Sequence, residues 1–141
     1  MKELTLLLGS NLGDRRAYID AALAALDKAL GGRRIKITQV IETEACGFEA
    51  PPFLNAAAVY LSARKPATIL KICKKIERSL GRTDAPEYAA DGSRIYHNRT
   101  IDIDILKYGD TVMNTPSLTI PHPQIVSRPF VKELLAQLDT A

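Results

Sequence analysis

The sequence predicts an α+β fold, in which an antiparallel sheet is backed by helices in a split βαβ arrangement. Strand-like and helix-like segments follow one another in the order strand, helix, strand, strand, helix, strand. Two segments carry apolar residues at helical spacing, and residues 101–105 alternate isoleucine with aspartate. With 141 residues, of which 46% are hydrophobic, the chain is expected to form a single domain over 1–141, with an extra C-terminal hairpin and helix.

The first half of the chain is expected to hold the first helix between strands. Residues 4–8 form a short apolar run typical of a buried strand, and Asp14 suits the N-cap of a helix that ends at the glycine pair 31–32. After a loop at 45–52, a further strand is expected at 55–61. Between the helix and this loop, one alternating strand is expected to place on one face Ile35, Ile37 and Ile41.

The second half begins with a helix over 66–81, with a proline in its first turn and a glycine at its end. Its apolar stripe includes Cys73, which is therefore expected to belong to the core. Residues 83–98 show no periodicity and read as a long loop, a feature that is often functional in a small domain. The rest is expected to be the strand 101–105, a turn at 109–110, a strand at 111–113 and a final helix with Pro129 in its first turn.

Composition excludes several classes of protein. The 19 basic and 16 acidic residues leave a net charge of +3, which is compatible with a polyanionic ligand but does not require nucleic acid. No apolar run reaches the roughly 20 residues of a membrane span, and the N-terminus lacks the pattern of a signal peptide. The two cysteines and two histidines show no metal-ligand spacing. The protein is expected in the cytoplasm, as a monomer.

Two aspartates in the strand 101–105 carry the sharpest chemical signal. Asp102 and Asp104 are two residues apart, so their Cα atoms are expected to lie about 6.5–7 Å apart and their carboxylates to project from one face, while the isoleucines anchor the other face. On a strand expected at the centre of the sheet, such a pair suits Mg²⁺ bound together with phosphate oxygens. The alternative is an edge strand whose acids are solvated and discourage pairing between sheets.

Basic residues near this pair favour the metal reading. Carboxylates that hold Mg²⁺, surrounded by guanidinium groups, are the parts that phosphoryl transfer to or from a nucleotide requires. The basic residues concerned are Lys74, Lys75, Arg78, Arg82, Arg94 and Arg99.

Two further features suggest ligand contacts. His122 lies in a proline-rich turn shortly before Arg128, so the pair suits an anion, although a histidine in such a turn is often only structural. Phe53 and Asn55 stand at a junction between loop and strand. They suit stacking on a flat heteroaromatic ring and hydrogen bonding to it, but Phe53 alone would simply fill the core. The segment 9–13 lacks the lysine of a P-loop.

Taken together, these segments resemble the 6-hydroxymethyl-7,8-dihydropterin pyrophosphokinase family along nearly the whole chain. The matching motifs are Gly9-Ser10-Asn11, Phe53 to Ala57, Glu77 through Gly81-Arg82, Arg99 to Ile105, Leu118 to His122, and Arg128-Pro129-Phe130. The resemblance implies a ferredoxin-like fold with three mobile loops. It also implies transfer of pyrophosphate from ATP to the pterin hydroxymethyl group, with release of AMP and with two Mg²⁺ ions.

The resemblance also implies roles for individual residues. Asp102 and Asp104 would hold both ions, and Arg82 and Arg99 would stabilise charge on the transferring group. His122 and Arg128 would contact the ATP phosphates. The nucleotide would be bordered by Glu77, Tyr96, Ile105 and Thr119. The pterin would be held by Thr43, the backbone of Cys46, Asn55 and the rings of Phe53 and Phe130.

Two alternatives from other functional classes remain at this point. A small RNA-binding module can use a similar sheet, but it needs exposed aromatic residues on a basic face, where this chain presents two aspartates. A catalytically dead regulatory domain is the other alternative, and the presence of both acids and both key arginines argues against it.

Overall fold

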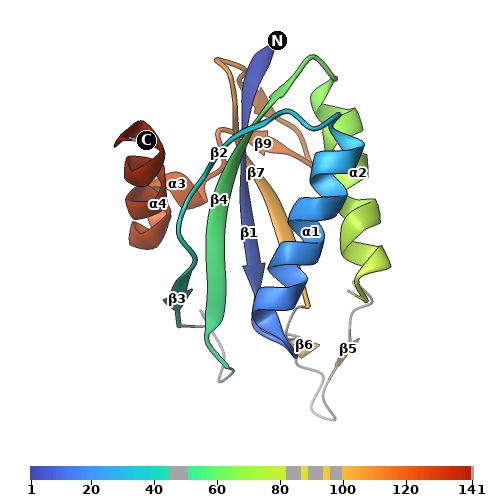
Figure 1. The fold of residues 1–141 in the computed structure, drawn as a ribbon, viewed down its shortest axis with the longest axis vertical. Coiled ribbons are helices and arrows are strands. Elements are labelled where there is room, and N and C mark those ends of the chain that lie inside the picture. Colours follow the sequence, from blue (N-terminus) through green and yellow to red (C-terminus); the bar gives the residue numbers. More distant parts are fainter. Residues whose placement is uncertain (45–50, 82–86, 89–93, 96–99, 141) are drawn as a thin grey trace.

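A sheet with helices on both faces forms the core of the protein, in a computed structural model that describes residues 1–44, 51–81, 87–88, 94–95 and 100–140. Helices α1 (Arg15–Ala29) and α2 (Pro66–Ser79) lie side by side on one face, and α4 (Pro129–Thr140) lies on the other (Figure 1). None of the described helices combines the length and apolar content needed to cross a bilayer.

The main sheet is antiparallel and has the order β7-β1-β4-β2. The central strand β1 (Lys2–Ser10) pairs with β4 (Phe53–Ser62) on one side and with β7 (Asp102–Tyr108) on the other. The edge beyond β4 is shared by β2 (Arg34–Ile37) and β3 (Ile41–Thr43), which both pair with β4. The antiparallel sheet and the order of its elements along the chain confirm the α+β prediction.

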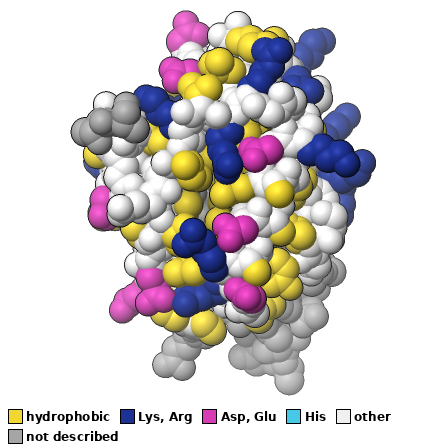
Figure 2. Space-filling view, viewed as in Figure 1, with side chains coloured by type: hydrophobic (Ala, Val, Ile, Leu, Met, Phe, Trp, Pro, Cys, Tyr) yellow, Lys and Arg dark blue, Asp and Glu magenta, His cyan; other side chains and the backbone are white. Residues whose placement is uncertain are grey.

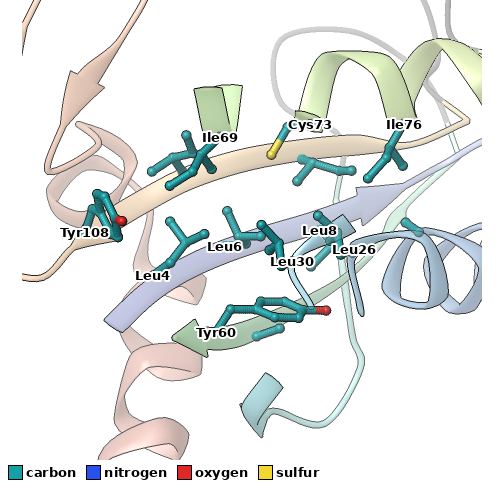
Figure 3. Packing of buried hydrophobic residues seen from close by; sticks show 14 of the residues in the cluster. Leu4, Leu6, Leu8, Leu26, Leu30, Tyr60, Ile69, Cys73, Ile76 and Tyr108 are labelled. Carbon is teal, nitrogen blue, oxygen red and sulfur yellow. The ribbon is translucent and has the colours of Figure 1, made fainter. Parts of the chain in front are cut away.

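Alternation along β1 divides the interior into two clusters. Leu4, Leu6 and Leu8 face α1 and α2, where they pack against residues such as Tyr60 and Cys73 (Figure 3). On the other face, Leu7 belongs to a second cluster beneath α4, together with Ala57, Val59, Leu106, Val131, Leu134 and Leu138. The predicted core position of Cys73 is confirmed, since its side chain is 1% exposed.

The helix boundaries follow the predicted signals. The Oδ1 atom of Asp14 accepts a hydrogen bond from the N–H of Ala17 at 3.1 Å, which caps α1 as expected. Pro66 stands in the first turn of α2. Gly31 and Gly81 follow the two helices with positive φ angles of 76° and 92°, a region that glycine adopts without steric cost.

The prediction of a single alternating strand around residues 35–41 is wrong. The chain forms two short strands there, and Ile35 and Ile37 are each 45% exposed. The register against β4 shifts between Arg34 and Lys36, which breaks the alternation. Thr38 then turns inward, and its Oγ1 accepts the N–H of Ala57 at 2.9 Å.

Other elements also differ from expectation. The segment read as a loop at 83–98 contains two short strands, β5 (Glu87–Tyr88) and β6 (Arg94–Ile95), which pair with each other. The late hairpin is confirmed, but as β8 (Met113–Asn114) with β9 (Thr119–Ile120). The four-residue helix α3 (Gln124–Ser127) was not expected. The central position expected for the strand with the two aspartates is wrong, because β7 lies at the edge of the sheet.

Charged side chains of both signs are interspersed over the face shown in Figure 2. This mixture agrees with the modest net charge of +3.

Candidate active site

One row of residues crosses the sheet where the end of β1 meets the starts of β4 and β7. Gly9 of β1 is paired with Asn55 on one side and with Asp102 on the other. These strand ends meet at the lower end of the molecule in Figure 1. Because alternate residues share a face, Asn55 lies on the same face of the sheet as Asp102 and Asp104.

Gly9 leaves this row open on the face that the three polar side chains share. A Cβ atom at this position would lie 2.8 Å from Oδ1 of Asn55 and 3.5 Å from Cδ1 of Phe53. Any larger residue would therefore collide with a side chain that the structure holds in place. The absence of a side chain at Gly9 therefore lets the amide of Asn55 approach the backbone of β1 closely.

Phe53 and Asn55 of β4 stand beside Gly9, and Thr43 of β3 pairs with Phe53. Asn55 is 5% exposed, and its Nδ2 donates to Oγ1 of Thr43 at 2.6 Å, which fixes the orientation of the amide. Phe53 is the first residue of β4, which confirms the predicted junction between loop and strand, and its side chain is half-buried. Phe130 packs against the cluster beneath α4, on the same face of the sheet.

The segment that leads into β4 is tied to the end of β1. Asn11 is almost fully buried, and its Nδ2 donates to the carbonyl of Pro51 at 3.2 Å. Arg15 donates to the carbonyl of Pro52 at 2.8 Å and forms an ion pair with Glu42 at 3.0 Å. These bonds hold the backbone that immediately precedes Phe53 against the end of β1 and the start of α1.

The two aspartates of β7 lie on one face, as predicted, while Ile101, Ile103 and Ile105 are buried on the other. Asp102 and Asp104 are both partly exposed. Within the described ranges, no group of three or more His, Cys, Asp or Glu side chains forms a metal site. Two carboxylates fit Mg²⁺, which is commonly bound by one or two of them together with water and substrate phosphates.

Glu77 of α2 anchors the edge of β7. Its side chain is 1% exposed, and Oε2 accepts the backbone N–H of Ile103 at 2.7 Å. Nζ of Lys74 lies 3.7 Å from the other carboxylate oxygen. One turn earlier, burial raises the pKa of the Cys73 thiol to about 12, and the charges of Glu77 and Asp104 act in the same direction.

His122 lies beside β7, since its N–H donates to the carbonyl of Leu106 at 2.8 Å. Its Nδ1 accepts the backbone N–H of Gln124 at 3.1 Å, which places the ring hydrogen of the neutral imidazole on Nε2. Burial lowers the pKa of His122, while the charge of Asp102 opposes this shift. The ring is therefore a neutral hydrogen-bond donor through Nε2 at neutral pH.

Gln124 is a polar residue of this region that the sequence did not single out. Its Nε2 donates to Oδ2 of Asp104 at 3.0 Å, and its Oε1 accepts from Nη1 of Arg128 at 3.1 Å. The Arg128 guanidinium also lies 4.5 Å from the centre of the Phe130 ring. No periodic pattern marks α3, so only the proximity of His122 and Arg128 in the sequence could have directed attention to Gln124.

The remaining candidate residues differ in where the structure places them. Thr119 is half-buried in β9, which lies against β7. The side chain of Ile105 is 3% exposed in the cluster beneath α1 and α2, on the opposite face of β7 from the aspartates. Four candidates fall outside the described residues, namely Cys46, Arg82, Tyr96 and Arg99.

Comparison with known proteins adds independent information. Residues 5–140 match a family described as 7,8-dihydro-6-hydroxymethylpterin-pyrophosphokinase. The chain is 44% identical over 135 residues to the 2-amino-4-hydroxy-6-hydroxymethyldihydropteridine pyrophosphokinase of Porphyromonas gingivalis, covering 94% of this chain and 88% of the relative. It is 33% identical over 132 residues to the protein of the same name from Bacillus subtilis, covering 93% and 74%. It is also 37% identical to a folate synthesis bifunctional protein of Chlamydia trachomatis, covering 94% of this chain and 29% of that protein.

Proposed function

The chain belongs to the 7,8-dihydro-6-hydroxymethylpterin-pyrophosphokinase family, and from this premise we propose that it transfers pyrophosphate from ATP to 6-hydroxymethyl-7,8-dihydropterin. The reaction releases AMP and serves folate biosynthesis. The single observation that supports this reaction best is the row Asn55–Gly9–Asp102, in which an amide suited to a heterocycle and a carboxylate suited to Mg²⁺ share one face of the sheet.

The pterin is proposed to lie over Gly9 between Phe53 and Phe130. Neighbouring strands are about 4.8 Å apart, so Asn55 and Asp102 are separated by roughly 10 Å across β1. A flat bicyclic ring held at Asn55 can extend its hydroxymethyl group toward Asp102. Stacking on two phenylalanine rings would add about 1 kcal/mol per ring beyond the burial of area. Thr43 and the backbone of Cys46 complete the proposed pterin site.

Asp102 and Asp104 are the proposed ligands of two Mg²⁺ ions. Bound there, Mg²⁺ would neutralise charge on the triphosphate and align the reacting groups. The donor set supports this assignment, because two same-face carboxylates leave the remaining coordination positions to water and phosphate oxygens. Arg82 and Arg99 are proposed to stabilise charge on the transferring group.

The chemical step needs alignment more than a strong base. The hydroxymethyl oxygen attacks the β-phosphorus of ATP, and the bond from this phosphorus to the oxygen bridging the α- and β-phosphates breaks. That oxygen leaves with AMP, and the hydroxyl proton passes to solvent. A loose transition state demands little proton abstraction before bond formation. Holding the two substrates in line supplies a large share of the rate enhancement.

His122 and Arg128 are proposed to contact the ATP phosphates. The Nε2–H of His122 and the N–H groups of Arg128 are donors, as phosphate oxygens require. Glu77, Tyr96, Ile105 and Thr119 are proposed to border the nucleotide. The backbone of Ile105 would make the proposed contact with the nucleotide, because the Ile105 side chain is buried on the opposite face of β7.

The chain is further proposed to act as a monomer of one domain over residues 1–141, in the cytoplasm. Light scattering during gel filtration is expected to give a mass near 15.5 kDa.

The decisive experiment measures AMP with ATP, Mg²⁺ and 6-hydroxymethyl-7,8-dihydropterin. We expect AMP and the pterin pyrophosphate in equal amounts, and no AMP when the pterin is left out or EDTA is added. Formation of ADP instead of AMP, or turnover that is indifferent to the pterin, would contradict the proposed function.

A further inference from the structure

We propose that Gln124 is a positioning residue. Its amide holds the metal-binding carboxylate of Asp104 and the phosphate-binding guanidinium of Arg128 in fixed positions relative to each other. The proposal rests on the function proposed above. It concerns a residue whose amide bonds to both groups at once.

The amide can join these two groups in only one orientation. Arg128 has only hydrogen-bond donors, and an ionised Asp104 has only acceptors. The amide oxygen must therefore face Arg128, at 3.1 Å from Nη1, and the amide nitrogen must face Asp104, at 3.0 Å from Oδ2. A carboxylate here could not donate to Asp104, and an ammonium could not accept from Arg128.

The backbone around Gln124 is itself fixed to the sheet. The N–H of His122 bonds to the carbonyl of Leu106 in β7, and the N–H of Gln124 bonds to Nδ1 of His122. The N–H of Arg128 then bonds to the carbonyl of Gln124 at 3.0 Å, closing one helical turn. This turn places the side chains of Gln124 and Arg128 on the same face.

The consequence is a link between metal binding and nucleotide binding. Groups that hydrogen-bond to metal ligands orient those ligands, and their loss typically weakens metal binding 10- to 100-fold. Gln124 orients Asp104 in this way, and it simultaneously restricts the guanidinium that is proposed to meet the phosphates. The Asp104 carboxylate and the Arg128 guanidinium are therefore both held in place before MgATP binds.

The test compares Gln124→Leu with Gln137→Leu as a matched control. Gln137 also uses its amide oxygen in a structural bond, to the N–H of Gln39 at 3.0 Å, but this bond joins α4 to the segment after β2. Isothermal titration without pterin would measure the Mg²⁺ dependence of binding of a non-hydrolysable ATP analogue. For Gln124→Leu we expect a 10- to 100-fold higher apparent Kd for Mg²⁺ and a higher KM for ATP, with the KM for pterin within about twofold.

A double-mutant cycle separates positioning from general stability. If Gln124 positions Arg128, then Arg128→Met should weaken analogue binding less in the Gln124→Leu background than in the wild-type protein. Additive effects, or wild-type metal and analogue binding by Gln124→Leu, would overturn the proposal. An equal loss in Gln137→Leu would do the same. AMP release by the wild-type protein tests the proposed function separately, so the two can fail independently.

Discussion

Oε2 of Glu77 accepts the backbone N–H of Ile103 at 2.7 Å, at the residue between the two proposed metal ligands. Strand β7 is the edge of the sheet, so Glu77 satisfies one of its outward N–H groups. Glu77→Leu would leave this N–H without an acceptor in a buried position. We expect a loss of about 1–3 kcal/mol in the free energy of unfolding, measured by denaturant titration.

Glu77→Gln is the control for this prediction, because an amide oxygen can still accept from Ile103. We expect it to retain most of the stability that Glu77→Leu loses. Equal destabilisation by the two substitutions would show that the charge of Glu77, and not its acceptor, supports β7.

The aspartates are expected to be indispensable for turnover. Asp102→Ala removes a proposed metal ligand at a partly exposed position of β7, so the protein should still fold. We expect AMP release to be abolished and thermal stability to change little, measured by a coupled assay and by calorimetry. Near-normal turnover in Asp102→Ala would refute the metal role of Asp102.

Gly9→Ala is expected to damage the pterin site selectively. The new Cβ would stand 2.8 Å from Oδ1 of Asn55, whose amide cannot move freely because it bonds to Thr43. Such overpacking typically costs about 1–3 kcal/mol. Steady-state kinetics should show a raised KM for pterin and a nearly unchanged KM for ATP.

A second substitution tests the cause of that defect. In the double variant Gly9→Ala with Asn55→Ala, the collision is gone, so stability should recover in part. Pterin binding should stay weak, because the amide is also gone. Full stability in Gly9→Ala alone would contradict the close approach of Gly9 and Asn55.

The buried thiol of Cys73 predicts a loss of stability at alkaline pH. Its pKa of about 12 in the folded protein lies above the ordinary thiol value of about 8.5. The raised pKa contributes its full stabilisation of the folded state at pH values below the pKa of the thiol in the unfolded chain. This contribution declines as pH rises from about 8.5 toward 12. One proton accounts for at most about 1.4 kcal/mol per pH unit.

Denaturant titrations between pH 7.5 and pH 10 would measure this decline. Cys73→Ala is less stable at every pH because it leaves a cavity, but its stability should fall less steeply with pH. Parallel pH profiles in the two proteins, or fast alkylation of Cys73 in the folded protein at pH 8.5, would contradict the buried position.

Local patterns in the sequence correctly predicted strand faces and helix starts, because these features depend on residues close together in the chain. The alternation of aspartate and isoleucine placed Asp102 and Asp104 on one face correctly, because each residue of a regular strand alternates in direction. The helix signals at Asp14 and Pro66 succeeded for the same reason, since a cap depends on the chain within one turn.

The predictions that were wrong concern features that depend on contacts between residues distant in the sequence. Ile35 and Ile37 alternate like a buried strand, but the register shift against β4 and the open edge of the sheet leave both exposed. The edge position of β7 is likewise a property of strand order. Gln124 was missed because one of its two side-chain partners lies 20 residues away, in another element.

Strand β1 has hydrogen-bonded neighbours along both of its sides, and it carries the floor of the proposed pterin site at Gly9. Amides in such a strand exchange with solvent mainly when the whole domain opens. The floor of the site is therefore part of the last region to lose its structure. We therefore expect the backbone at Gly9 to adopt its final conformation on folding, before any substrate binds.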